Sequence, residues 1–157
     1  METASDYEEL FKILNACRIK YLVVGAHAVS YYAEPRFTKD LDVWIGPEIN
    51  DPNRVFAALR QFGAPLSGMS PADFQDRKMI LQIGVAPVRI DILMKVPGVS
   101  FLSAWRNRKK VRYGRTAIHV MGLTDLIKAK EKAGRPQDLL DLSKLRVYRQ
   151  KKRTRRI

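Results

Sequence analysis

The chain has 157 residues, of which 46% are apolar and 29% charged, as in a folded globular domain rather than a disordered segment. Its single cysteine excludes an internal disulfide, no apolar run approaches the roughly 18 residues that span a bilayer, and the acidic start is unlike a secretory signal. We therefore expect a cytoplasmic protein without a membrane partner, whose net charge of +13 favours a polyanionic ligand.

The positive charge is concentrated in the last third of the sequence. Residues 1–105 contain 11 Lys and Arg against 12 Asp and Glu, whereas residues 106–157 contain 18 against 4. The basic residues are densest over 106–115 and 149–157. Such clusters favour tRNA or another RNA over a membrane surface as the partner. A solvated basic surface is the alternative interpretation, because a basic run alone carries little specificity.

The first half of the chain predicts alternating helices and strands. Leu10, Phe11 and Leu14 have helical spacing. Asp51 and Gly63 are typical of the start and the end of a helix. We expect helices over residues 6–19, 26–33 and 51–63, and strands over residues 21–25 and 40–45.

The second half predicts a hairpin, a further strand and a closing pair of helices. After a loop over residues 64–73, the elements are strands over 78–84 and 88–93, a helix over 100–110, a strand over 115–121, and helices over 123–133 and 136–149. This order indicates a mixed α/β (α+β) sandwich with four or five strands. We expect one domain over residues 1–149, closed by the helix pair at 123–149, and a basic tail over 150–157.

Two aspartates on one predicted strand are the first sign of chemistry. Asp40 and Asp42 alternate with Leu41 and Val43, so both carboxylates face one side, about 7 Å apart along the strand. Two neighbouring acids repel each other and call for a cation. Mg²⁺ prefers carboxylates together with substrate phosphates. Salt bridges to nearby basic side chains are the structural alternative.

A third acid, Asp91, lies between isoleucines on a later predicted strand, where a carboxylate is costly unless it meets a metal or a partner. Three carboxylates on adjacent strands can hold two metal ions during phosphoryl transfer. The segment before Asp40 predicts an anion site, because a strand ends at Gly25 and a helix begins at Ala26. Arg36, Thr38 and Lys39 follow and can neutralise phosphate charge.

The combination of these motifs resembles the nucleotidyltransferase superfamily, which has a DNA polymerase β-like fold. The pattern is strand, Gly-(Gly/Ser/Ala), helix, Arg-x-Thr-x-Asp-x-Asp and a later strand aspartate. It is most similar to the small proteins that include the AbiEii-type abortive-infection toxins. In this sequence the positions are Gly25, Ala26, Arg36, Thr38, Asp40, Asp42 and Asp91.

The C-terminal helix pair resembles the same family over Leu-x-x-Leu-x-x-x-Lys-x-x-x-x-Arg-x-x-Asp-x-x-Asp. Lys130, Arg135, Asp138 and Asp141 occupy the charged positions. The resemblance implies that this segment lies near the active site and that its Lys and Asp assist phosphate contact or catalysis. Asp138 as a helix cap, and Asp141 paired with a cation one turn away, are the structural alternatives.

The resemblance implies a Mg²⁺-dependent enzyme that binds a nucleoside triphosphate such as ATP and transfers its nucleotidyl group to a hydroxyl. An RNA 3′ end or a protein is favoured over a small molecule, and a role beside a cognate toxin or antitoxin protein fits the subgroup. Many relatives have Ser after the glycine, whereas this chain has Ala26. A catalytically idle nucleotide- or RNA-binding regulator, similar to an antitoxin, is therefore the alternative function.

Overall fold

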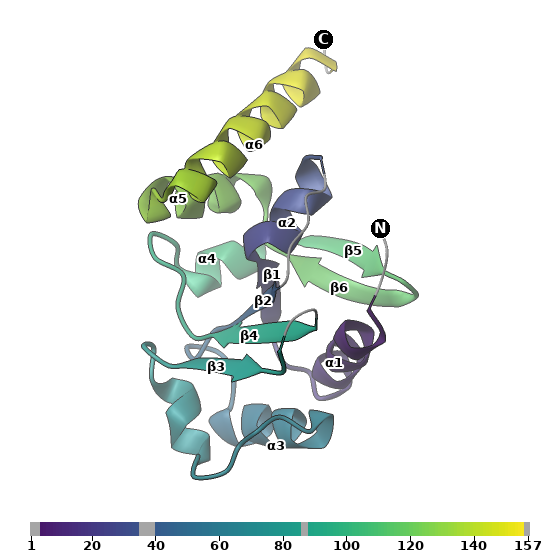
Figure 1. Ribbon diagram of the computed structural model, residues 1–157, viewed down its shortest axis with the longest axis vertical. Coiled ribbons are helices and arrows are strands. Elements are labelled where there is room, and N and C mark those ends of the chain that lie inside the picture. The colour runs from purple at the N-terminus through teal and green to yellow at the C-terminus, as the bar shows by residue number, and fades with distance from the viewer. Residues whose placement is uncertain (1–3, 35–39, 86–87, 156–157) are drawn as a thin grey trace.

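Six strands form one mixed sheet in the order β3-β4-β2-β1-β6-β5 (Figure 1). The computed structural model describes residues 4–34, 40–85 and 88–155. Pairs β1–β2, β3–β4 and β5–β6 are antiparallel, and pairs β2–β4 and β1–β6 are parallel. The strands are β1 (Tyr21–Val24), β2 (Asp40–Ile45), β3 (Ile80–Ile83), β4 (Arg89–Leu93), β5 (Lys109–Tyr113) and β6 (Thr116–Val120).

The helices cover the sheet in two groups. One helix, α2, packs against β1 and β2 and also contacts α5 and α6, whereas α1 contacts α3 and β6. Helix α6 continues past the body of the molecule to the C-terminus (Figure 1). The helices are α1 (Ser5–Ala16), α2 (Gly25–Tyr32), α3 (Pro52–Phe62), α4 (Phe101–Arg106), α5 (Leu123–Ala133) and α6 (Pro136–Arg155), with a 3₁₀ turn at Pro71–Gln75.

Local signals fix several of these boundaries. The Asp51 side chain accepts a hydrogen bond from the Asn53 N–H at 2.9 Å, which caps α3. Gly63 ends that helix with φ +95°, a conformation that glycine adopts without steric cost. Both ends of α3 were predicted from the sequence to within one residue.

The strand that carries the first two aspartates alternates as the sequence predicts. Leu41 and Val43 are buried in the core, while Asp40 and Asp42 are only partly buried on the other face. Trp44 is fully buried and meets Phe101 edge-to-face, with ring centroids 4.9 Å apart. This core holds β2 rigidly, so the two carboxylates project from a fixed strand.

The prediction of four or five strands was too low, because the helix predicted over residues 100–110 is wrong in its second half. Helix α4 ends at Arg106, and β5 begins at Lys109. The strand lies at the sheet edge and most of its residues are exposed, and its two apolar residues, Val111 and Tyr113, give an alternation too short to predict a strand. Only its pairing with β6 reveals it.

Two other predicted helix boundaries also shift. The first helix ends at Ala16 rather than residue 19, and Arg18 turns the chain with φ +56°. The last helix runs to Arg155, beyond the predicted end at 149, so most of the predicted basic tail is helical. None of the helices in the described parts of the chain combines the length and the hydrophobicity that a membrane crossing requires.

Candidate active site

Neighbouring parallel strands bring the three aspartates together. In the register of β2 and β4, Asp42 lies opposite Asp91, and Asp40 lies opposite Arg89. Asp91 is partly buried and projects from β4 on the same face as Asp42, because residues directly opposite each other on neighbouring strands share a face. Two segments about 50 residues apart in sequence therefore form one acidic cluster on the sheet.

Asp42 has the most perturbed carboxylate of this cluster. Its pKa is raised to about 6, first by burial and then by the negative charges of Asp91 and Asp40, against which Lys130 and Arg135 act. A cation bound beside a carboxylate in such surroundings stabilises its charged form. The three aspartates thus have the donor chemistry that fits Mg²⁺.

Arg89 is the cation that the acidic cluster already holds. Its Nε lies 3.5 Å from Asp40 Oδ1 and 3.3 Å from Asp91 Oδ1. The Gln82 amide, with its oxygen turned toward Arg89, accepts from the same Nε at 2.6 Å. Within the described ranges no three His, Cys, Asp or Glu side chains form a ready metal-ligand set. The guanidinium between Asp40 and Asp91 is a physical reason for this.

The start of α2 lies against the acidic cluster. Gly25 has φ +66°, and a Cβ at this position would overlap the Asp42 carboxylate. Glycine is therefore required twice here, by its backbone conformation and by the close approach of Asp42. Ala26 follows with only its backbone N–H to offer. The free N–H groups at the start of this helix form a potential anion site next to the acids.

Three predicted phosphate-contacting residues, Arg36, Thr38 and Lys39, lie outside the described residues. They precede Asp40 directly in the chain. Their roles stay predictions.

Lys130 lies in a buried ionic network at the junction of α5 and α6. Its Nζ is 3.1 Å from Asp138 Oδ1 and 3.0 Å from Asp141 Oδ2. All three side chains are almost completely inaccessible to solvent. Gln137 adds a hydrogen bond to Asp141 at 3.1 Å. The structure thus gives Lys130 two carboxylate partners, for which a helix cap and an ion pair one turn away were the structural alternatives to a role in the site.

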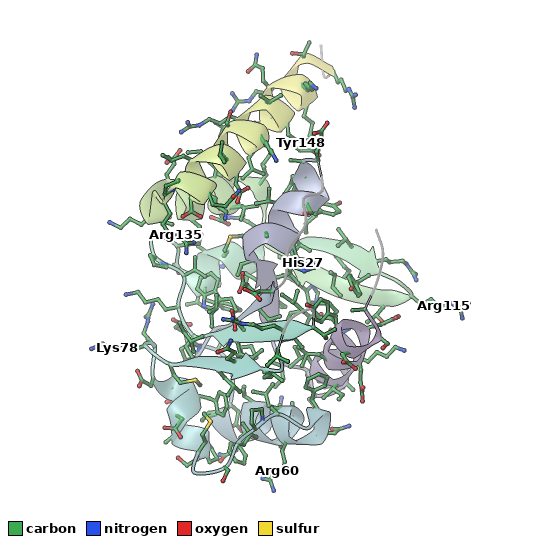
Figure 2. The ribbon with its side chains drawn as sticks, viewed as in Figure 1. His27, Arg60, Lys78, Arg115, Arg135 and Tyr148 are labelled. Carbon is green, nitrogen blue, oxygen red and sulfur yellow. The ribbon has the colours of Figure 1, made fainter. Side chains whose placement is uncertain are left out.

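Arg135 attaches to the same network from its exposed side (Figure 2). Its Nε donates to Asp138 Oδ2 at 2.6 Å, and its backbone N–H donates to the same oxygen at 3.1 Å. Burial raises the pKa of Asp138, but the hydrogen bonds from Arg135 and Lys130 outweigh it, and the net pKa lies below the usual value. Asp138 is therefore ionised at neutral pH and holds two cations near Asp42.

A cavity of about 150 Å³ joins the acidic cluster to the helix pair. The carboxylate of Asp42 and the cationic side chains of Lys95, Lys130 and Arg135 line this cavity together. Sequence reasoning missed Arg89 and Lys95; the position of Arg89 two residues before Asp91 on one strand could have identified it. The polar lining residues are Asp42, Lys95, Lys130, Arg135 and Asp138, with Gly25 on the wall.

The histidines lie apart from this chemistry. His27, on α2 (Figure 2), has its pKa lowered by burial and packs edge-on against Tyr7 with centroids 5.6 Å apart. Burial, then Arg108 and Lys110, lower the pKa of His119 to about 4. Both rings are neutral at pH 7, and packing against aromatic side chains explains their positions.

A family model described as "Nucleotidyl transferase of unknown function (DUF2204)" matches residues 3–156 of the chain. A search of curated proteins found no match. The family model thus spans both the acidic cluster and the helix pair.

Several solved structures share the fold. A protein from Thermotoga maritima described as a nucleotidyltransferase is 15% identical, with a TM-score of 0.57 and 88% of each chain covered. The antibiotic-resistance factor ANT(2″)-Ia is 9% identical, with a TM-score of 0.59, covering 96% of this chain and 91% of that one. The lincosamide antibiotic adenylyltransferase LnuA is 14% identical, with a TM-score of 0.54 and coverage of 92% and 98%. The mixed sheet with flanking helices is therefore a nucleotidyltransferase-like fold.

Proposed function

This chain belongs to the nucleotidyl transferase family whose model spans residues 3–156, and from that premise we propose that it moves a nucleoside monophosphate from a triphosphate to a hydroxyl acceptor. The observation that carries the proposal is the pairing of Asp42 with Asp91 on adjacent strands, beside the start of α2. An acidic cluster next to an anion site suits a triphosphate that arrives with a divalent cation.

The reaction is an in-line displacement at the α-phosphorus. The acceptor hydroxyl oxygen forms a bond to the α-phosphorus, the bond to the bridging oxygen breaks, and pyrophosphate leaves with that electron pair. Asp91 takes the hydroxyl proton, or it serves as a metal ligand while that proton passes to water. The backbone N–H groups of Gly25 and Ala26 bind the phosphates, while Lys130 and Arg135 add positive potential.

Asp40, Asp42 and Asp91 fit Mg²⁺ by their donor chemistry, and the raised pKa of Asp42 reflects negative charge that a cation would relieve. Bound there, two magnesium ions would stabilise the charge on the attacking and leaving oxygens. For the three aspartates to converge on one ion, the Arg89 guanidinium has to leave the space between Asp40 and Asp91. A freed Arg89 would then lie close enough to contact the triphosphate.

The acceptor that the charge distribution favours is an RNA 3′ end or a protein. The net charge of +13 repels cationic small molecules such as aminoglycosides. The related folds ANT(2″)-Ia and LnuA are an antibiotic-resistance factor and an antibiotic adenylyltransferase, so a small-molecule acceptor is the competing hypothesis. A neighbouring toxin or antitoxin gene would agree with the resemblance to AbiEii-type proteins.

The test is transfer of label from each α-³²P nucleoside triphosphate with Mg²⁺, in the presence of total tRNA or cell lysate. We expect label on RNA or protein with the parent chain and none with Asp42→Asn. Glu9→Gln is the matched control, because it removes one exposed negative charge from α1 and should leave transfer unchanged. Full transfer by Asp42→Asn would disprove the assignment of the acidic cluster.

A catalytically idle regulator that binds nucleotide or RNA is the alternative. Ala26 lacks the hydroxyl that many relatives place at the phosphates, and Lys130 is held by two carboxylates. This alternative predicts that the protein binds nucleotide in equilibrium dialysis but transfers no label to RNA, protein or small molecules. Restoring transfer with Ala26→Ser would identify the missing hydroxyl as the cause.

A further inference from the structure

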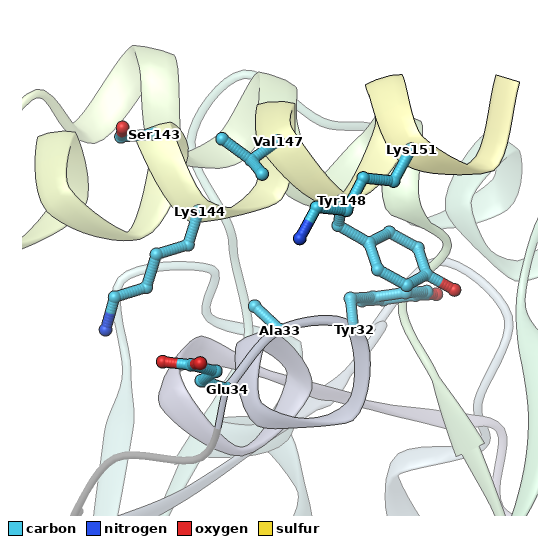
Figure 3. A pocket seen from close by; sticks show the side chains of 8 residues that line it. All are labelled: Tyr32, Ala33, Glu34, Ser143, Lys144, Val147, Tyr148 and Lys151. Atoms are coloured by element: carbon cyan, nitrogen blue, oxygen red, sulfur yellow. The ribbon is translucent and has the colours of Figure 1, made fainter. Parts of the chain in front are cut away.

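A second and larger cleft, of about 360 Å³, lies between the end of α2 and the middle of α6 (Figure 3). It is separate in its lining from the cavity at Asp42. Two tyrosines, an exposed valine and two lysines border it, and the acid Glu34 lies where α2 passes into the chain toward β2. The lining residues are Tyr32, Ala33, Glu34, Ser143, Lys144, Val147, Tyr148 and Lys151.

The aromatic wall of this cleft is held in place by packing. Tyr32 is buried, and its hydroxyl donates to the Met121 carbonyl at 2.8 Å. The Tyr148 ring meets Tyr32 edge-to-face, with centroids 5.8 Å apart and planes at 61°. Tyr148 is only half-buried, so part of its ring remains accessible in the cleft. An ordered, partly exposed aromatic ring is a platform on which a planar group can stack.

The same stretch of α6 carries an excess of positive charge, of which Arg146 is paired with Glu131 of α5 at 3.1 Å. Residues 144–155 contain seven Lys and Arg and no Asp or Glu. Like charges three or four residues apart destabilise a helix, and the helix dipole offsets this only within the last turn. The cations from Lys144 to Arg149 therefore need anions from outside the helix. Lys152 Nζ lies 5.6 Å from the centre of the Tyr148 ring, which adds a cation to the aromatic platform.

Both helices that border the cleft also border the candidate active site. Helix α2 begins at Gly25 beside Asp42, and the cleft lies about 12 Å further along it, by the rise per helical residue. Helix α6 carries Asp138 at the Asp42 cavity, and Lys144 and Lys151 follow about 9 and 20 Å along its axis. A chain molecule seated in the cleft can therefore extend toward the acidic cluster.

We propose that this cleft binds single-stranded RNA, with one base stacked on Tyr148 and the neighbouring phosphates on Lys144 and Lys151. An aromatic platform within a basic groove is the arrangement by which proteins hold single strands. The apolar Val147 would suit a protein segment, whereas the seven cations of residues 144–155, with no acid among them, favour a polyanion. One part of this inference rests on the proposed function, namely that the 3′ end of the bound RNA reacts at Asp42.

The experiment is fluorescence anisotropy with a short, 5′-labelled single-stranded RNA, at several salt concentrations. We expect Tyr148→Ala to weaken binding roughly tenfold, because stacking is worth about 1–3 kcal/mol per base, and Tyr148→Phe to restore it. We expect Lys144→Glu/Lys151→Glu to weaken binding more strongly and to reduce its salt dependence. Retained triphosphate binding and an unchanged melting temperature would show that these variants are folded.

The matched control is Arg60→Glu/Lys78→Glu, which changes the net charge equally, with Arg60 at the end of the molecule opposite Tyr148 and Lys78 on its flank (Figure 2). We expect this pair to lower RNA affinity by no more than about twofold. Equal losses in the two double variants would overturn the proposal, because binding would then follow net charge alone. Unchanged binding by Tyr148→Ala would overturn it as well.

The two proposals fail in distinguishable ways. Cleft-dependent RNA binding without any transfer of label would disprove the enzyme and leave the RNA site standing. Transfer of label to a protein or an antibiotic, with no RNA binding at the cleft, would disprove the RNA site and leave the enzyme standing.

Discussion

The ionised Asp42 carboxylate lowers the stability of the folded protein. Its pKa is about 6 in the folded chain, against 3.8 for an ordinary Asp, chiefly because it is buried and secondly because Asp91 and Asp40 repel it. Between about pH 4 and 6 the folded state holds more protons at this residue than the unfolded state does. The free energy of unfolding therefore falls as the pH rises through this window, and the cost is complete above pH 6.

Replacing Asp42 with Asn should therefore stabilise the metal-free protein at pH 7.5 by up to about 3 kcal/mol, since each pKa unit corresponds to about 1.4 kcal/mol. The gain should shrink as the pH approaches 4, where the parent carboxyl is protonated. Urea unfolding at several pH values measures this difference. A variant less stable than the parent at pH 7.5 would contradict the assigned environment of Asp42.

Arg89 balances the negative charge of the acidic cluster when no metal is bound. Because its guanidinium pairs with Asp40 and Asp91, we expect Arg89→Ala to lower the melting temperature without metal. We also expect a larger rise on adding Mg²⁺, because the cation no longer competes with Arg89 and ligand binding stabilises the folded state. Arg77→Ala, which breaks an exposed pair with Glu48 at 3.3 Å, is the control. An equal Mg²⁺ response in parent and Arg89→Ala would refute the competition.

At the scale of elements, the junction of α5 and α6 depends on one buried cation. Lys130 pairs with both Asp138 and Asp141, whose side chains are 2% and 0% exposed. Removing one member of a buried ionic group typically costs about 3–5 kcal/mol, because the remaining charges lose their partner. The junction in turn sets where α6 leaves the body, and so where both the cavity and the cleft lie.

We expect Lys130→Met to destabilise the fold by about that amount, measured by urea unfolding at pH 7.5. Combining it with Asp138→Asn and Asp141→Asn should recover most of the loss, since the two buried carboxylates that lost Lys130 are then replaced by neutral amides and Arg135 is exposed to water. If the triple variant is stable yet transfers no label, the network also serves the reaction. A single variant as stable as the parent would show that the network contributes little to folding.

At the scale of the whole molecule, positive charge and stability reside in different parts. The last fully buried residue of α6 is Leu145. Residues 146–157 contribute seven positive charges and no negative ones. Residues 146–157 thus add positive electrostatic potential to the molecule but contribute little to its core.

Truncation after Leu145 should lower the melting temperature only slightly, because the main loss is the contact between Tyr148 and Tyr32. The truncated chain should elute from heparin at clearly lower salt, since its net charge falls from +13 to +6. Calorimetry and heparin chromatography test the two parts. A collapse of the fold would show that the end of α6 belongs to the core.

Much of this molecule is encoded locally. The alternation in 40–45 and the turn signals at Asp51 and Gly63 specify their own strand and helix, because side-chain period and capping depend on neighbours within a few residues. The glycine that begins α2 and the spacing of the aspartates likewise indicated the nucleotidyltransferase superfamily from sequence alone.

The tertiary structure decided what depends on register between distant segments. Only the pairing of β2 with β4 places Asp42 beside Asp91 and inserts Arg89 between the acids. Only the packing of α5 on α6 buries Lys130 with two aspartates, for which the sequence left a site role, a helix cap and an ion pair open. The edge strand β5 was missed for the same reason: its hydrogen bonds to β6, and not its own hydrophobic pattern, make it a strand.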